Sequence, residues 1–216
     1  AALAGARSHD DFVAAVPCPP LRQALAAAGD FFRLHPRPFI LETALDAGYL
    51  RELLRLAGRL PRGEREPVRR LAAQEADIFH LMLAARGRFH YDLPAEMLAA
   101  LHVPGSAIDG ERFATLLAAR DLAALAAAAG RVLDEAPPAA DAGLFEVLAW
   151  NRFLRLANAA FRRSHHGVGA VIGYTAIRRI ELANLITLAE GMRLGLEARV
   201  LRGRLIPRSV GEAAHV

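Results

Sequence analysis

The sequence contains no lysine, and all 27 of its basic residues are arginine. This absence excludes the phosphate-binding lysine of P-loop enzymes, the strand lysine of protein kinases and any Schiff-base lysine. Cysteine is almost as scarce, since Cys18 is the only one and lies between two prolines. A single thiol cannot form an internal disulfide, a four-cysteine zinc site or an iron–sulfur cluster, and it suggests a reducing compartment.

Aromatic-rich basic patches and long apolar runs are also missing. Aromatic residues make up 6% of the chain, the net charge is +4, and arginines alternate with acids, as in Arg62–Arg70. This pattern predicts a self-paired surface and no nucleic-acid partner, and it leaves open a mild attraction to an anionic membrane face. Charged residues interrupt every apolar stretch, including Leu122–Leu133, so we expect no membrane-spanning helix. Residues 1–7 lack an initiator Met and a secretory apolar core, which predicts a cytoplasmic protein.

What the sequence does have is helical periodicity over nearly its whole length. With 216 residues, 54% of them apolar, the chain is long enough to bury a core. The pair Ser8-x-x-Asp11 is typical of a helix N-terminus, and Gly87 is expected to end the fourth helix. No segment alternates with period two, so the fold class that fits is all-α. The expected helices span residues 8–16, 21–34, 39–60, 64–86, 95–101, 110–120, 121–133, 144–163 and 171–200.

The chain resembles itself when it is shifted by 104 positions, which places residues 40–89 over residues 144–193. Polar residues and a glycine near the end of the second helix keep register together, which compositional chance explains poorly. We therefore predict a helical bundle built from two copies of a helical-hairpin unit. The identical pairs include Glu42 and Glu146, Leu50 and Leu154, Arg51 and Arg155, Arg59 and Arg163, Ala72 and Ala176, Leu81 and Leu185, Ala85 and Ala189, and Gly87 and Gly191.

This duplication suggests a division of the chain into four parts. They are an N-terminal helical segment (1–38), a first helical repeat (39–134), a second helical repeat (135–207) and a flexible tail (208–216).

Six polar residues nearly reproduce the ligand set of a di-iron bundle, which takes a carboxylate from each of two helices and a carboxylate-x-x-His pair from each of two others. They are Asp77, His80, Glu181, Asn184, Glu42 and Glu146. The pattern fails at Asn184, because an amide is a poor iron ligand. A di-iron or ferritin-like protein therefore stays as the alternative. The simpler interpretation is that Asp77 and Glu181 form ion pairs with the copy-related Arg51 and Arg155.

No other segment requires catalytic chemistry. The glycines of Gly167–Gly173 follow a helix rather than a strand, so they predict a tight chain reversal and close helix packing, not a dinucleotide loop. His165 and His166 lie beside arginines without an acid to orient them, which predicts a surface pair. Asp46, Tyr49 and Asp77 could act as acids or bases, but nothing in their spacing singles them out. We expect no catalytic, cofactor-binding or metal-binding residues.

The segment Gly169–Leu185 resembles a signature near the end of the C subunit of V/A-type rotary ATPases, called subunit d in the vacuolar enzyme. The matching positions are Gly173-Tyr174 at the start of a long helix, then Glu181, then Asn184-Leu185. Further matches lie upstream, in order, so that the resemblance covers Ser8–Pro207. They are Ser8–Leu25, Glu42–Tyr49, and Glu75-Ala-Asp77-Ile78 with His80-Leu81, where His80 replaces the more usual Asn.

The resemblance implies a non-catalytic central-stalk subunit that couples the shaft of the ATP-hydrolysing head to the membrane rotor ring for ion transport. Its partners would be the shaft subunits and the ring, and it would be peripheral, on the cytoplasmic side of the membrane. It would use no cofactor, nucleic acid or small-molecule substrate. Members of the family usually carry a further N-terminal copy of the helical unit, whereas this chain begins just before the second. Two competing hypotheses are a helical nucleic-acid regulator and an interaction module unrelated to rotary motors.

Overall fold

The computed structural model describes residues 7–133, 142–164 and 166–206. Regular structure in these residues is entirely helical, which confirms the all-α prediction. The helices are α1 (His9–Ala15), α2 (Pro19–Ala27), α3 (Gly29–Leu34), α4 (Pro38–Gly58), α5 (Arg62–Met82), the π-helix η2 (Leu83–Arg88), α6 (Ala95–Ala99), α7 (Gly110–Leu117), α8 (Leu122–Leu133), α9 (Ala142–Arg163), α10 (Val168–Arg193) and α11 (Ala198–Arg204). The predicted tail at 208–216 lies outside the described residues.

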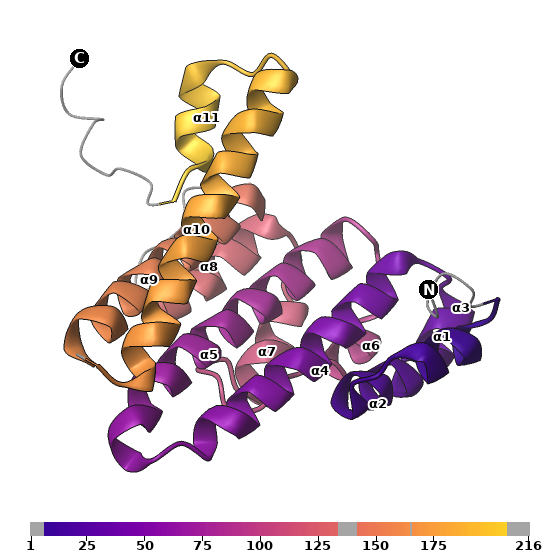
Figure 1. Cartoon of the computed structure of the whole chain (residues 1–216). Helices are drawn as coiled ribbons and strands as arrows, with labels where there is room; N and C mark the ends of the chain where they lie inside the picture. The colour runs from indigo at the N-terminus through magenta and orange to yellow at the C-terminus, as the bar shows by residue number, and fades with distance from the viewer. Residues whose placement is uncertain (1–6, 134–141, 165, 207–216) are drawn as a thin grey trace.

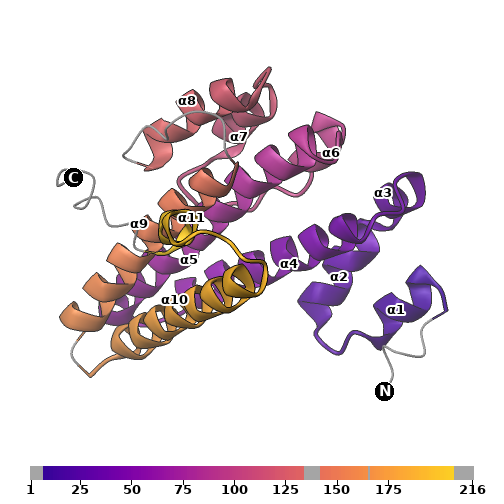
Figure 2. The same ribbon diagram turned by 90° about the horizontal axis from the view of Figure 1, so that it is seen from above.

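Four long helices form the body of the molecule. Helix α5 packs against α4, α9 and α10, and α9 and α10 form an antiparallel hairpin (Figure 1). Seen from above, α6, α7 and α8 lie on one side of α5 and α9, while α10 lies on the other (Figure 2). Helix α2 packs against α4 at the edge farthest from α9. One side of α5 is therefore covered by later parts of the chain, whereas none of the described helices covers the outer side of α10.

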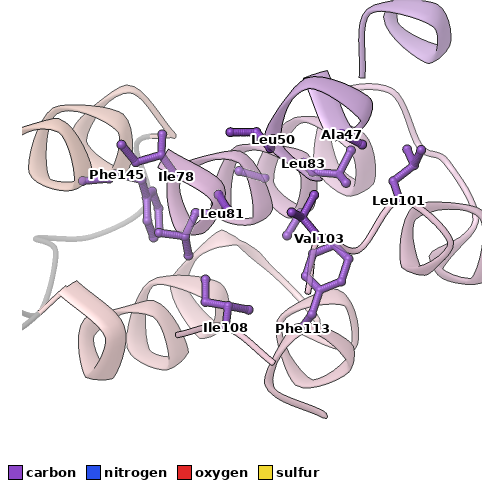
Figure 3. Packing of buried hydrophobic residues seen from close by; sticks show 14 of the residues in the cluster. Ala47, Leu50, Ile78, Leu81, Leu83, Leu101, Val103, Ile108, Phe113 and Phe145 are labelled. Atoms are coloured by element: carbon purple, nitrogen blue, oxygen red, sulfur yellow. The ribbon is translucent and has the colours of Figure 1, made fainter. Parts of the chain in front are cut away.

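A single apolar core connects these helices. Figure 3 shows Leu50 of α4, Leu81 of α5 and Phe113 of α7 converging with Val103 and Ile108, which lie between α6 and α7. All five side chains are at least 97% buried. Burying side chains of this size contributes roughly 1.5–3 kcal/mol each. This core holds the segment between α6 and α7 against α5.

Two helices differ from their predicted extents. The helix expected over residues 21–34 is divided at Ala28, where buried Gly29 lies against the ring of His9 from α1. The helix expected over residues 171–200 starts three residues earlier, at Val168, and ends at Arg193. Gly195 (φ +69°) causes this end, because its left-handed conformation lets the N–H of Leu196 bind the carbonyl of Gly191 at 2.9 Å.

Two glycines have packing roles. The prediction that Gly87 ends a helix is wrong: it lies within η2, where a Cβ would stand 2.8 Å from the Leu98 side chain of α6. At Gly173 a Cβ would stand 2.6 Å from the backbone N of Phe161 and 2.7 Å from the carbonyl O of Ala157. The expectation that the glycines of Gly167–Gly173 allow close helix packing is therefore confirmed at Gly173, where α10 crosses α9.

Candidate partner-binding surface

Asp77 and His80, two of the six possible metal ligands, are buried and bind backbone instead. The Asp77 carboxylate accepts a hydrogen bond from the N–H of Ile108 (2.9 Å), and His80 Nε2 accepts one from the N–H of Val103 (2.9 Å). Both donors belong to the segment that joins α6 to α7, which we call the 102–108 loop. The two side chains therefore fasten this loop to α5.

The hydrogen bonds of the loop define the protonation state of His80. Because Nε2 accepts, Nδ1 carries the proton and faces Ser106 Oγ at 3.4 Å. Burial, with smaller contributions from the positive charges of His102 and Arg51, lowers the pKa of His80 to about 3. Burial also raises the pKa of Asp77, against the opposing hydrogen bond from Ile108. The ring of His102 stacks on His80 with centroids 4.8 Å apart, which adds an aromatic contact under the loop.

The other four possible metal ligands lie apart from this pair. Glu146 forms an ion pair with Arg86 at 2.7 Å, and Glu181 forms one with Arg178 on its own helix. Glu42 is exposed, while Asn184 accepts a hydrogen bond from the N–H of Ile206 at 3.0 Å. Among the described residues no group of three or more His, Cys, Asp or Glu side chains could hold a metal ion. The di-iron alternative thus has no assembled site in this part of the chain.

The proposed ion pairs of Asp77 with Arg51 and of Glu181 with Arg155 are wrong. Arg51 donates instead to the carbonyl O of His102 (2.9 Å), so it supports the same loop from α4. Arg155 is exposed, and Glu181 binds Arg178. The sequence could not reveal this, because the loop carbonyls that replace the carboxylates as partners lie about 50 residues away in the chain.

The remaining candidates lie on the surface. Asp46 and Tyr49 are exposed on α4, and partial burial together with nearby negative charge raises the pKa of both side chains. His166 is exposed, whereas His165 falls outside the described residues. At the start of α10, the N–H of Gly169 donates to Glu64 Oε2 at 3.2 Å, so this glycine-rich turn is closed by a carboxylate. None of these residues joins another candidate in an arrangement for catalysis.

The most unusual feature of the surface is helix α10. Large apolar side chains lie uncovered along it, with exposed fractions between 53% and 73%. We call them the α10 stripe: Val171, Tyr174, Leu182, Leu185, Ile186 and Met192. Val171, Leu185 and Met192 fall in one heptad register, in which Arg178 takes the remaining position. Sequence reasoning placed a helix here but missed the stripe, although apolar residues on every face of a helix indicate a second packing surface.

A groove continues this surface at the far end of α10. There α11 folds back beside α10 and α9 (Figure 1) and encloses a volume of about 660 Å³. Trp150, Ile180 and Leu201 form part of its apolar lining, and Glu190 and Arg204 are charged residues along it. Arg179 also lines the groove, where it pairs with Glu75 of α5 at 2.8 Å and lies over the Trp150 ring at 5.0 Å.

Uncovered apolar helices on a closely packed helical body are typical of a subunit of a larger assembly. A scan against protein families matches residues 1–204 to the ATP synthase (C/AC39) subunit family. The chain belongs to this family, and the resemblance to the C subunit of V/A-type rotary ATPases is confirmed. Neither a curated protein nor a solved structure matches the chain. None of the described helices combines the length and the apolar character that crossing a bilayer requires.

Proposed function

We propose that this protein is a non-catalytic subunit that couples the central shaft of a V/A-type ATPase to its membrane rotor ring. The observation that carries the proposal is the α10 stripe, within a chain of the C/AC39 family. Six large side chains this exposed would cost stability and solubility in a free protein, and burial against a partner removes that cost. The subunit would lie on the cytoplasmic side of the membrane, as a peripheral component.

The spacing of the stripe favours a helical partner. Positions 171, 178, 185 and 192 repeat every seven residues, the interval at which one helix packs along another. A straight contact along 22 residues of α10 would extend for about 30 Å. We therefore assign the stripe to a helix of the shaft.

Coupling also requires that the part between shaft and ring does not yield under torque. Close packing supports this role at Gly173, where α10 touches the backbone of α9, and at Arg179, which links α10 to α5 and α9. The 102–108 loop adds a third fixed point, held by His80 and Asp77.

Two helical repeats, with the boundaries predicted above, are part of the proposal. Two sets of contacts agree with the shift of 104 positions. Gly87 lies against Leu98 of α6, and Gly191 lies against Leu201 of α11. His80 binds the backbone 23 residues later, and Asn184 binds the backbone 22 residues later.

Co-purification with the shaft subunits tests the function. We expect the wild-type chain to bind purified shaft, and Leu182→Ser/Leu185→Ser to bind at least about tenfold more weakly, since two apolar anchors lose their contact. Leu34→Ser/Leu56→Ser is the matched control, because both leucines are exposed away from the stripe. A wild-type protein that does not bind the shaft, or a control that loses as much affinity, would contradict the proposal. Thermal unfolding of each variant verifies that it is folded.

A further inference from the structure

We propose that the end of the molecule formed by the α4–α5 and α9–α10 turns rests on an anionic lipid surface. This inference depends on the proposed function, which places the subunit beside a membrane. We call this region the basic end; it comprises residues 51–70 and 152–177.

Charge is strongly concentrated at the basic end. Its two segments carry 11 arginines and three glutamates, a net charge of +8, whereas the rest of the chain carries −4. The sequence alone suggested arginines balanced by neighbouring acids. In the fold that balance fails, because residues 152–177 contain no acid at all and lie beside residues 51–70. A positive surface of this kind attracts anionic headgroups, and each arginine near them adds to the binding.

The two turns form one surface. Glu64, near the start of α5, accepts the hydrogen bond from Gly169 at the start of α10, and Pro67 also lies beside Gly169. In Figure 1 both turns lie at the same end of the long helices, away from α11. Arginines of both hairpins can therefore meet one flat partner together.

The acids of the basic end are already occupied. Glu64 binds Gly169, Glu66 binds Arg70, and Glu52 binds Arg55. In contrast, Arg62, Arg162 and Arg163 are exposed and form no ion pair with any described residue. These three guanidinium groups are available for an external anion, and each can bind a phosphate with two parallel hydrogen bonds.

Apolar side chains among the arginines favour a lipid over a nucleic acid or an acidic protein surface. Phe161 and Val168 are 45% and 42% exposed, directly beside Arg162, Arg163 and the turn. Arginine mixed with aromatic and aliphatic side chains is the composition of segments that lie in the headgroup region, where apolar groups enter the acyl boundary and guanidinium groups remain at the phosphates. A purely electrostatic contact would gain nothing from these apolar groups.

Sedimentation with lipid vesicles tests the inference. We expect the full chain to bind phosphatidylcholine vesicles that contain about one third phosphatidylglycerol, to bind pure phosphatidylcholine weakly, and to dissociate at high salt. Arg162→Gln/Arg163→Gln should weaken binding about thirtyfold. Arg199→Gln/Arg202→Gln is the matched control, because these exposed arginines of α11 lie at the opposite end of α10 and form no ion pair with described residues. Phe161→Ser/Val168→Ser should weaken binding about tenfold at unchanged charge.

The proposal fails if the wild type ignores anionic vesicles, if the α11 control loses as much binding, or if the apolar variant binds as well as the wild type. It also fails if Arg162→Gln/Arg163→Gln weakens binding to a detergent-solubilised rotor ring while vesicle binding is unchanged, since the basic end would then contact protein. The shaft assay is independent, so loss of vesicle binding with intact shaft binding overturns this inference and leaves the proposed function standing.

Discussion

Helices α5 and α10 occupy corresponding positions under the shift of 104 residues, yet their surroundings differ. On α5 the inner face is closed by the 102–108 loop and by α7, and Leu81 is 1% exposed. On α10 the corresponding Leu185 is 63% exposed, and α11 folds back over the far end of the helix alone. Other described parts of the chain therefore cover the apolar side chains of α5, whereas they leave the corresponding side chains of α10 exposed. The difference supports the proposal that a partner covers the α10 stripe.

Truncating the two corresponding leucines, Leu81 and Leu185, tests this difference in burial most directly. Leu81→Ala should lower the free energy of unfolding by about 3 kcal/mol, because it leaves a cavity in the core. Leu185→Ala should change it by less than about 0.5 kcal/mol, since the side chain is already in water. Urea unfolding of both variants measures the difference. Equal losses would mean that α10 is covered in the free protein, and would remove the basis for a partner on the stripe.

Gly173 offers the next largest effect, because α10 approaches α9 more closely there than a side chain allows. Gly173→Ala places a methyl group against backbone atoms of Ala157 and Phe161, so the helices must separate, at a cost of about 2 kcal/mol. Gly58→Ala is the control: apart from its chain neighbours and the nearby backbone of its own helix, no atom lies within 4 Å of the position that a Cβ would take, and alanine favours the helix. Thermal unfolding distinguishes them. A stable Gly173→Ala variant would show that the α9–α10 contact is looser than the structure indicates.

His80 distinguishes α5 from α10 by its response to pH. The pKa of His80 is about 3 in the fold, below its ordinary value of 6.5, so the unfolded chain binds the proton first. The contribution of His80 to stability is therefore complete above pH 6.5 and is lost as the pH falls toward 3. The free energy of unfolding of the wild type falls as the pH is lowered from about 6.5 to 4.5. In His80→Asn, which places at position 80 the residue type found at Asn184 of α10, this fall should be smaller by about 2 kcal/mol.

The control for this experiment is His166→Asn, which makes the same substitution at an exposed histidine on the surface. Chemical unfolding at a series of pH values gives the result. The groups that face His80 from the packed elements are His102, Arg51 and Ser106, and none of them is altered by the substitution. An unchanged pH profile in His80→Asn would mean that the fold does not lower the pKa of His80.

The sequence predicted those features that depend on neighbouring residues. The capping pair at Ser8 forms as expected, with the N–H of Asp11 3.1 Å from Ser8 Oγ, and periodicity located the long helices α4, α5 and α9 to within a few residues. The early end of α10 was missed, because apolar periodicity continues through Gly195 and only its positive φ reverses the chain. Local patterns therefore identify helices better than their ends.

Features that depend on distant residues were not predicted. The spacing of Asp77 and His80 allowed a metal site only as an alternative, and the interpretation that it favoured, an ion pair of Asp77 with Arg51, was wrong, because the partners of Asp77 and His80 are backbone groups of the 102–108 loop. Within Arg62–Arg70 the local balance of charge does form an ion pair, between Glu66 and Arg70 at 2.7 Å. For Asp77 and His80, in contrast, tertiary contacts decide what the polar side chain meets.

The smallest expected effect concerns Arg179 of α10, which forms an ion pair with α5. Its guanidinium pairs with Glu75 of α5 and lies over Trp150 and Phe153 of α9, whereas the neighbouring Arg178 pairs with Glu181 on its own helix. Arg179→Gln should cost about 1 kcal/mol, and the matched Arg178→Gln about 0.3 kcal/mol, since exposed pairs within one helix contribute little. Unfolding at low and high salt measures both. If the two substitutions cost the same, the three-helix contact at Arg179 contributes no more than a surface ion pair, and α10 is held to α5 and α9 by packing alone.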